Sequence, residues 1–555
     1  MRVIPQHSTA FVRVAVIEFE PLPGGLFAAY AHPLKPNTLM VLPRLFRRSV
    51  LFIPVLLVAC SSRDPSLGTL GYGLTLAPTG IDPHLNASVE LGIPLSSVYD
   101  TLVYRDSETN GFVPGLATEW EVSPDGLSYT FFLREDVRFH DGERFDAEAV
   151  RANLEYTLDP EHASQKAASM LGPLLEIEVL DPYTVALHLE VPFSPLLDSL
   201  SQVYLGMASP KSLTTWGPGD YQFHQVGTGP YRFVEDLQDD HLTLQRNPDY
   251  AWGPEIYSSR TAQIETITFR FFEDVATRAP ALESGAVDII GELPANEVER
   301  IAQLPDLEVQ QIPIPGQPLQ FMFNTELAPT DDVRVRQALV LGVDRAAIVS
   351  TVFGGYSPVA SGPLAGDLFA ISEEAAFPEY DPLAARELLG QAGWGGGTGL
   401  ELRLVVPNWG SNPEVGQLVA AAWEQLGAAV TLEVAAGFGP LSQARGEGNY
   451  HAIGMNSFGT DPDLLRPFFA SDGFFNWSGY HDPRFDQLLT EGTLESQSAQ
   501  RSSIYSDLAE RVREQWLILP IREYVNLVGV NRRVEGLRFS PQGWFPYLID
   551  LHLRP

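Results

Sequence analysis

The sequence predicts an α/β protein of at least two lobes. In the first third of the chain, apolar Tyr129, Phe131 and Leu133 alternate with their neighbours, and residues 183–189 alternate in the same way. This period of two is typical of half-buried strands in an antiparallel sheet. The last third of the chain carries an α/β pattern instead. A change from strand-rich to α/β sequence indicates separate lobes.

The α/β pattern lies in residues 400–434. Residues 400–404 alternate as a strand, residues 415–426 place their apolar side chains on one helical face, and residues 430–434 alternate as a second strand. Gly427 can end the helix between them. A strand, a helix and a strand at this spacing predict a βαβ unit with parallel strands.

Aspartates mark the expected starts of two helices. Asp146 can cap the free amides of a helix that begins at residue 147. Asp331 or Asp332 can do the same for a helix that carries Arg334 and Arg336. We expect these two arginines to pair with surface carboxylates rather than to contact a ligand.

The composition excludes several functional classes. Residues 1–59 hold six of the 36 Lys and Arg residues and two of the 70 Asp and Glu residues, so residues 60–555 carry a formal net charge of −38. Such a charge argues against nucleic-acid binding and against broad docking on anionic lipid. A hydrophobic content of 45% and an aromatic content of 10% indicate a packed globular protein.

Cys60 is the only cysteine, and it ends the run Leu57-Val58-Ala59-Cys60. Basic Arg44, Arg47 and Arg48, an apolar stretch at 50–58 and small Ala59 before the cysteine form the pattern of a secretory leader. The pattern resembles a bacterial lipoprotein signal, in which the cysteine takes a lipid. The alternative is a structural cysteine in an apolar helix, although the stretch is shorter than the roughly 20 residues that span a bilayer.

The leader fits only part of the N-terminal region. A start at Met40 gives a leader of ordinary length, so we expect residues 1–39 to be absent from the natural protein and residues 40–59 to be removed before Cys60. Residues 60–66 form a short polar tether. The Arg47-Arg48 pair also resembles a weak twin-arginine export signal, so the export route stays open.

The sequence offers no enzymatic motif. It lacks a Gly-x-Ser-x-Gly elbow, a His-Glu-x-x-His zinc motif, a phosphate-binding Gly-x-x-x-x-Gly-Lys loop and a dinucleotide fingerprint. His140 and Asp141 are the nearest approach to a metal pair, but a turn explains them better. We therefore predict no catalytic residue, no metal and no cofactor. A glycosidase-type carboxylate pair is not excluded by counting acidic residues.

A series of different short blocks follows in a fixed order along the chain. They are Leu116 to Glu121, Ser123 to Gly126, Val137 to Gly142, Gly227 to Tyr231, Asn247 to Tyr250, Ala281 to Asp288, Phe323 to Thr325, Asp332 to Leu339 and Tyr380 to Pro382. In order and spacing they resemble the family 5 extracellular solute-binding proteins, the peptide and nickel receptors of ABC importers. The match runs from about Gly71 to Leu553. One spacing differs from the family pattern: Ala251 separates Tyr250 from Trp252, and the family usually has these two residues adjacent.

The resemblance implies a two-lobed fold of the periplasmic-binding-protein type (type II, cluster C), with an extra inserted domain and a ligand cleft at the hinge. Lobe I is expected at residues 67–104, 217–318 and 521–555, the inserted domain II at 105–216, and lobe III at 319–520. Two strand connections between lobes I and III act as a hinge, and ligand binding closes the lobes.

The resemblance also implies ligand-binding residues in the run Asn456-Ser457-Phe458-Gly459-Thr460-Asp461. Asp461 matches the aspartate that receives the α-ammonium of a bound peptide, and a carboxylate gains strength as water leaves a closing site. The alternative is that Asp461 begins an Asx-Pro turn or caps a helix at Leu464. Asn456, Ser457 and Phe458 are expected to line the same site.

Two further segments are candidates. Residues 80–86 resemble the family's first hinge-side loop, with His84 in the loop and Asn86 able to bond a polar group; a plain Asp-Pro turn is the alternative. Trp409 follows the strand at 400–404 and is a candidate apolar wall, with core packing as the alternative.

The resemblance implies a receptor for oligopeptides or dipeptides that breaks no bond itself. It is expected to be a monomer, held through Cys60 on the outer face of the cytoplasmic membrane or in the periplasm, and to deliver its solute to a permease with its ATPase. Nickel chelates, sugars or opines are alternative ligands on the same fold. A secreted hydrolase is the alternative from another class.

Overall fold

The computed structural model describes residues 68–76, 80–237, 240–365, 375–395 and 399–554, and the backbone of residues 16–21 and 27–32. Residues 1–62 and 63–555 form two separate compact units. In the first unit, β1 (Val16–Pro21) pairs antiparallel with β2 (Phe27–His32). The expected leader cleavage and the lipid on Cys60 lie outside the described residues. None of the helices in the described ranges has the length and apolar character needed to span a membrane.

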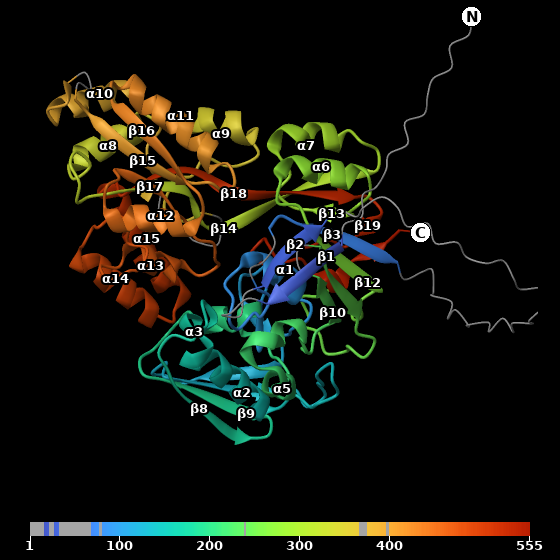
Figure 1. Cartoon of the computed structure of the whole chain (residues 1–555). Coiled ribbons are helices and arrows are strands. Elements are labelled where there is room, and N and C mark those ends of the chain that lie inside the picture. Colours follow the sequence, from blue (N-terminus) through green and yellow to red (C-terminus); the bar gives the residue numbers. More distant parts are fainter. Residues whose placement is uncertain are drawn as a thin grey trace, which may run out of the picture. The chain divides into compact units, whose positions relative to one another are not determined.

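The second unit is organised around one ten-stranded sheet, in which non-consecutive strands are neighbours (Figure 1). Its strands in spatial order are β10 (Tyr231–Leu237), β11 (His241–Arg246), β12 (Thr266–Phe271), β3 (Thr69–Leu74), β13 (Ile289–Ile290), β18 (Ile518–Asn531), β14 (Leu307–Phe323), β17 (Ala452–Gly454), β15 (Glu401–Pro407) and β16 (Ala429–Ala435).

The two longest strands, β14 and β18, join the halves of this sheet. They lie side by side and antiparallel at its centre (Figure 1). The helices near one end are α6 (Val275–Glu283) and α7 (Ala295–Ala302), and those near the other are α8 (Val333–Leu341), α9 (Arg345–Phe353), α10 (Pro382–Gln391) and α11 (Asn412–Gln425). Their register breaks between Ile314 and Leu319, where β14 contains Gly316. Extra residues at a register break bend a strand and redirect its side chains. The break is therefore where the sheet passes from one lobe to the other.

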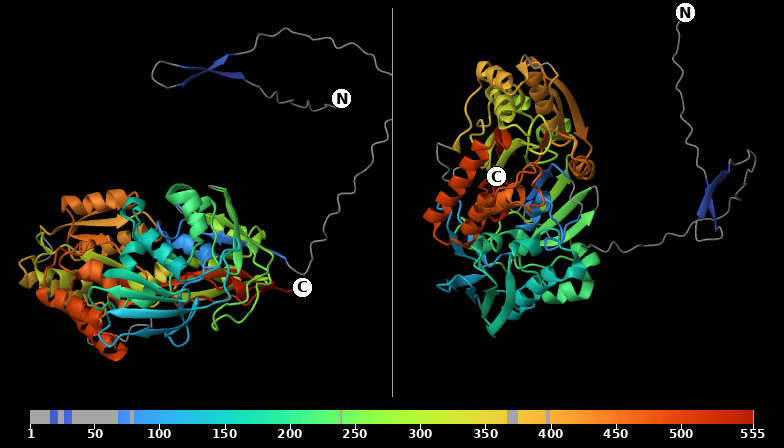
Figure 2. Two further views of the ribbon diagram at one scale, coloured as in Figure 1. Left: turned by 90° about the horizontal axis from the view of Figure 1, so that it is seen from below. Right: turned by 90° about the vertical axis from the view of Figure 1, so that its left-hand side faces the viewer.

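The predicted βαβ unit is confirmed. β15 pairs parallel with β16, and α11 (Asn412–Gln425) connects them. The face of α11 that carries Val415, Val419 and Trp423 is buried. Gly427 follows the helix with a φ of 99°, a conformation that glycine adopts without the steric cost of a Cβ. The elements of this region stay grouped in both views of Figure 2.

A separate four-stranded antiparallel sheet confirms the strand pattern of the first third. Its strands in spatial order are β6 (Ala117–Val122), β7 (Ser128–Leu133), β9 (Thr184–Leu189) and β8 (Leu174–Asp181). All four lie within residues 105–216, the range expected for domain II. The predicted cap at Asp146 is confirmed as well, because its side chain accepts a hydrogen bond from the Ala149 amide at the start of α2 (Ala147–Leu158).

Helices cover the sheets on their exposed faces. The remaining α-helices are α1 (Val89–Leu95), α3 (Ala167–Met170), α4 (Leu196–Ser199), α5 (Pro210–Asp220), α12 (Phe438–Glu447), α13 (Arg466–Phe469), α14 (Pro483–Leu494) and α15 (Ser498–Glu514). One hydrophobic core draws its residues from the stretch between Leu319 and Ile521. The exact three-part division of the chain stays a prediction.

The expectation for Arg334 and Arg336 is half right. Arg334 pairs with Asp332, which caps α8. Arg336 was expected at the surface, but it is only 2% exposed and donates hydrogen bonds to the carbonyl oxygens of Thr330 and Gln515. The surface prediction is wrong for Arg336 because backbone carbonyls from a distant segment, rather than carboxylates, receive its guanidinium.

Candidate functional site

The loop after β17 lies at the edge where ligands bind in α/β sheets. β15, β16 and β17 run parallel, so their carboxyl ends meet at one edge of the sheet. Asn456, Ser457 and Phe458 follow the carboxyl end of β17, and Trp409 follows that of β15. Trp409 is 38% exposed. The structure therefore brings these four predicted residues to the same edge of the sheet.

The β17 loop is held against the register break of β14. The Gln317 amide donates to the Ser457 carbonyl at 2.8 Å, and the Gly459 amide donates to the Pro315 carbonyl at 3.2 Å. The Gln317 side-chain oxygen accepts the Ser457 amide at 3.0 Å. Gly316 has a φ of 131° and packs against the Phe458 backbone. The loop and the strand crossing thus form one unit.

Three aromatic side chains meet beside this crossing. Phe458 lies edge-on to Tyr524 of β18, with ring centroids 4.6 Å apart, and 5.6 Å from the centroid of Trp544. The Tyr524 hydroxyl donates to the Asn456 side chain at 3.3 Å. Aromatic faces provide the apolar wall that small-molecule sites need. Phe458 precedes the other two members of the trio by more than 60 residues, so the fold brings the β17 loop to them.

Polar atoms around the trio retain unused hydrogen-bonding capacity. Within the described ranges, Gln317 Nε2, Gln320 Oε1, Arg522 Nε and Trp544 Nε1 are buried without a hydrogen-bond partner. Such atoms are uncommon in folded proteins, because an unpaired buried polar group costs free energy. Convergent polar groups beside an aromatic wall are typical of a site for a small polar solute. We call this group, together with the trio, the hinge site.

Acidic groups from the residue range expected for lobe I act on the hinge site, where the charge of Glu292 reaches Tyr524 and Arg522. Glu90 of α1 is 7% exposed, and its Oε1 accepts the Thr75 hydroxyl at 2.6 Å. Burial, together with the nearby charge of Glu292, raises the pKa of Glu90 to about 7, against the lowering effect of the Thr75 hydrogen bond. Arg278 donates to the carbonyl of Glu292 at 3.0 Å and lies 3.7 Å from its carboxylate.

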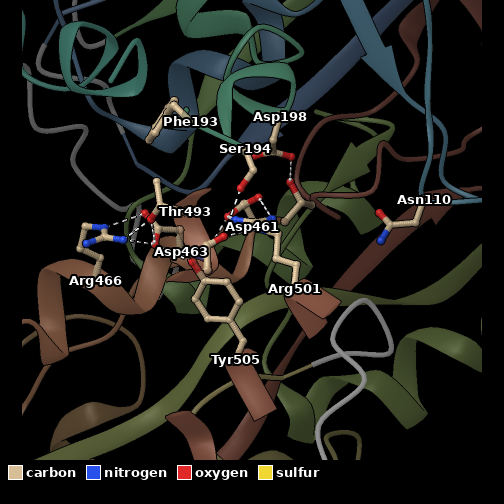
Figure 3. A network of polar contacts seen from close by, with 12 residues as sticks. Asn110, Phe193, Ser194, Asp198, Asp461, Asp463, Arg466, Thr493, Arg501 and Tyr505 are labelled. Atoms are coloured by element: carbon tan, nitrogen blue, oxygen red, sulfur yellow. Dashed lines mark hydrogen bonds and ion pairs between the residues drawn. The ribbon is translucent and has the colours of Figure 1, made fainter. Parts of the chain in front are cut away.

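Asp461 has a protein partner. Both of its carboxylate oxygens lie 2.6 Å from the guanidinium of Arg501, and both side chains are 14% exposed (Figure 3). Burial alone would lower the pKa of Arg501, but the charge and hydrogen bonds of Asp461 raise it above its usual value. Asp461 also accepts the Asp463 amide at the start of the short helix at Pro462–Leu465. The capping alternative is thus present, and the ammonium role stays a prediction.

A polar cavity of about 410 Å³ adjoins this ion pair. Its wall includes Asp461 and Arg501 from lobe III and Asn110 from the range of domain II. Ser496 and Ser498 add hydroxyl groups to the wall. The cavity therefore lies between the residue ranges expected for domain II and for lobe III, and it is bounded by groups that suit water or a polar substituent.

The ion pair predicts a stability effect. Replacing Asp461 or Arg501 by alanine leaves one charge poorly solvated, which costs about 3 kcal/mol of unfolding free energy for a mostly buried pair. Asp249→Ala is the matched control, because the Asp249 carboxylate is 79% exposed in its pair with Arg232, and exposed pairs contribute about 0.5 kcal/mol. Guanidinium unfolding measures both. Equal losses at Asp461 and Asp249 would contradict the structural role.

The two candidates in residues 80–86, His84 and Asn86, form hydrogen bonds within the protein. His84 is 1% exposed, and its ring nitrogens lie 3.3 Å from an Asp82 oxygen and 2.8 Å from the Gly206 carbonyl. Asn86 is partly exposed and donates to the Asp82 carbonyl at 3.2 Å. His84 is thus satisfied within the core, and Asn86 closes a local turn. Ligand contacts by either residue stay predictions.

The hinge site also contains residues that sequence reasoning did not select. Arg522 interrupts an apolar run on β18, and Gly316 lies within the proline-rich stretch of β14. Each departure from a strand pattern is a signal of a special role, but the sequence gives no sign that Arg522, Glu90 and Trp544 belong together.

Comparison with known proteins supports the same family. A model of bacterial extracellular solute-binding proteins, family 5 (middle region) matches residues 111–477. The chain is 28% identical over 519 residues to heme-binding protein A of Haemophilus influenzae, covering 87% of this chain and 92% of that protein. It is 27% identical over 488 residues to the glutathione-binding protein GsiB of Pectobacterium atrosepticum, covering 84% and 91%.

Solved structures share the fold. NikA from Brucella suis in complex with Fe(III)-EDTA is 25% identical, with a TM-score of 0.78 over 88% of this chain and 100% of that chain. DppA from Helicobacter pylori in complex with the peptide STSA is 24% identical, with a TM-score of 0.73 over 88% and 98%. The chain belongs to the family 5 bacterial extracellular solute-binding proteins, and it is a substrate-binding protein of an ABC importer rather than an enzyme.

Proposed function

We propose that this protein captures short peptides at the hinge site and delivers them to a membrane permease. The observation that carries the proposal is the meeting of the aromatic trio with unpartnered buried polar groups at the β14–β18 crossing. A peptide offers amide donors and acceptors to such groups and side chains to an aromatic wall. The glutathione-binding relatives favour this class, since glutathione is itself a tripeptide.

We further propose that the protein acts outside the cytoplasmic membrane, held by a lipid on Cys60. The leader pattern supports this arrangement, and a tether raises the effective concentration of a receptor at its permease. The mass of the N-terminal peptide of the native protein tests it. A diacylated cysteine at position 60 is expected, whereas an unmodified N-terminus upstream of Cys60 would contradict the anchor.

Contacts between domain II and lobe III suggest how the bound state is held. The Thr460 hydroxyl donates to Asp198 at 2.7 Å, and Asp198 also pairs with Arg105. The Ser194 amide donates to the Thr493 carbonyl at 2.8 Å. We call these contacts the latch. Hinge closure around a ligand is typical of two-lobed receptors, and contacts made across the lobes in the closed state slow ligand release.

The latch predicts a kinetic effect of Thr460→Val. The change keeps the shape of the side chain but removes a hydrogen bond to a charged carboxylate, which is worth about 1.5–3 kcal/mol. We expect peptide dissociation to become about tenfold faster or more, measured by stopped-flow tryptophan fluorescence. Thr109→Val is the matched control, because the Thr109 hydroxyl makes only exposed hydrogen bonds, to Asp106 and from the Gly111 amide. Equal dissociation rates for the two variants would exclude the latch.

Titration calorimetry with dipeptides and tripeptides tests the proposed function. Saturable 1:1 binding, with every peptide recovered intact, is expected. Nickel chelates, sugars and opines form a parallel panel. Binding of one of those solutes with no binding of any peptide would replace the peptide proposal and leave the family unchanged.

A further inference from the structure

The lobe I side of the hinge site contains a buried carboxylate, of which one oxygen accepts a hydrogen bond and the other has no hydrogen-bond partner within the described ranges. Glu90 Oε1 accepts the Thr75 hydroxyl, while Glu90 Oε2 is buried and has no partner within the described ranges. Helix α1 carries this carboxylate, and the charge of Glu292 acts on it together with that of Arg278. A buried carboxylate oxygen without a donor is expensive, and a cationic donor from a ligand would satisfy it.

Glu292 joins Glu90 into one acidic group. Arg278 bonds the carbonyl of Thr75 at 3.5 Å and the carbonyl of Glu292 at 3.0 Å, so it links the two segments that carry the acids. Glu292 is a non-glycine residue with a φ of 49°, and such backbone strain concentrates at functional sites. Two carboxylates and one guanidinium leave the group with one net negative charge when both acids are ionised.

A cation faces the site from β18. Arg522 lies between two aromatic rings, 4.0 Å from the centroid of Phe353 and 4.4 Å from that of Tyr524. Its Nη1 donates to the Ser357 hydroxyl at 3.0 Å, and its Nε is buried without a partner within the described ranges. Burial lowers the pKa of Arg522, while the charges of Tyr524 and Glu292 act in the opposite direction. A desolvated guanidinium held in place by aromatic rings is well suited to bind a carboxylate.

The acidic group and the cation are spaced along one strand. The Glu292 amide donates to the Asn526 side chain at 2.7 Å. Asn526 follows Arg522 by four residues on β18, so their side chains point to the same face of the strand. Four residues of strand span about 13 Å, and an extended peptide covers about 3.4 Å per residue. This span along the strand equals that of about three or four residues of an extended peptide.

We infer that the hinge site binds a zwitterion, with Glu90 and Glu292 receiving the ammonium of a short peptide and Arg522 its carboxylate. This inference rests on the proposed function. It assigns the ammonium to a different carboxylate from Asp461, whose charge is already matched by Arg501 at 2.6 Å. The ligand class is therefore a peptide with both termini free.

Three probes test the assignment by titration calorimetry at pH 7.2: Ala-Ala-Ala, its N-acetyl derivative and its C-terminal amide. We expect the wild-type protein to bind the free tripeptide about 30-fold more tightly than either blocked form, because each block leaves a buried charge unpaired. Glu90→Gln should remove the preference over the N-acetyl form alone. Arg522→Gln should remove the preference over the amide alone. Glu143→Gln, at an exposed carboxylate, is the control and should keep both preferences.

The pH dependence gives a second readout. A proton on Glu90 competes with the ammonium, so the affinity for Ala-Ala-Ala should rise about tenfold between pH 5.5 and 7.2 in the wild-type protein and stay flat in Glu90→Gln. The groups that face Glu90 are Tyr72, Tyr204, Arg278 and Glu292. Burial, together with the charge of Glu90, raises the pKa of both tyrosines far above this window.

A variant that only misfolds would lose affinity for all three peptides. The inference instead requires each variant to lose one preference and to keep the other. Tight binding of all three probes by the wild-type protein would overturn the inference and leave the proposed function standing. Loss of the N-acetyl preference in Asp461→Ala, with none in Glu90→Gln, would return the ammonium to Asp461. Failure of the wild-type protein to bind any peptide would overturn the proposed function and the inference together.

Discussion

Gly316→Ala should reduce peptide affinity about 100-fold or more. A Cβ at this position would lie 2.7 Å from Phe458 Cα, 2.7 Å from the Ser457 carbonyl and 2.9 Å from the Gly459 amide. All three are backbone atoms, so no side-chain rotation relieves the clash and the β17 loop must move. Displacing a binding loop by about 1 Å is enough to cost a factor of about 100 in function. Titration calorimetry with Ala-Ala-Ala measures the effect.

Gly142→Ala is the matched control, because it introduces backbone strain without crowding a neighbouring atom. Gly142 also has a positive φ, of 89°, but a Cβ there would meet nothing within 4 Å. We expect this variant to lose about 1 kcal/mol of stability and to keep its affinity. Similar affinities for Gly316→Ala and Gly142→Ala would show that the contact between the β17 loop and the strand crossing is not needed for binding.

Asp100→Ala should cost about 4 kcal/mol of unfolding free energy, the largest stability effect that we expect from a single substitution. Asp100 is 2% exposed and accepts hydrogen bonds from Tyr104, Thr228, Tyr250 and Trp252 at 2.8–3.0 Å. Burial raises its pKa, although the four hydrogen bonds act in the opposite direction. Truncation leaves four buried donors without an acceptor and opens a cavity.

Asp100→Asn is the companion variant in guanidinium unfolding. It preserves the volume and one strong acceptor, so we expect about half of the loss. Equal stability of Asp100→Ala and the wild-type protein would show that the four donors find water or other acceptors. Because none of these four hydrogen-bond partners belongs to the hinge site, we expect any folded fraction of either variant to keep its peptide affinity.

Local sequence determined the elements that were predicted correctly. The βαβ unit at residues 400–434 follows from apolar spacing within 35 residues, and Asp146 caps α2 with an amide only three residues away. Arg336 shows the limit of such reasoning. Its carbonyl acceptor at Gln515 is 179 residues distant, so its burial could not be seen from neighbouring residues.

The candidate site was predictable only in part, for the same reason. The resemblance selected the segment from Asn456 to Asp461, and the structure places the first part of that segment in the hinge site. It could not select Glu90 or Arg522, because they come from segments more than 400 residues apart that meet only when the ten-stranded sheet is assembled. Nor could it show that Arg501, 40 residues after Asp461, neutralises that carboxylate.

Native mass spectrometry with Ala-Ala-Ala tests the central claim most directly, namely that this chain is a receptor that binds a free peptide at the hinge site without altering it. We predict a single 1:1 adduct of the intact peptide mass on the wild-type protein, strongly reduced in Gly316→Ala and retained in Gly142→Ala. Hydrolysed peptide, or an adduct of equal abundance in Gly316→Ala and the wild-type protein, would contradict the account.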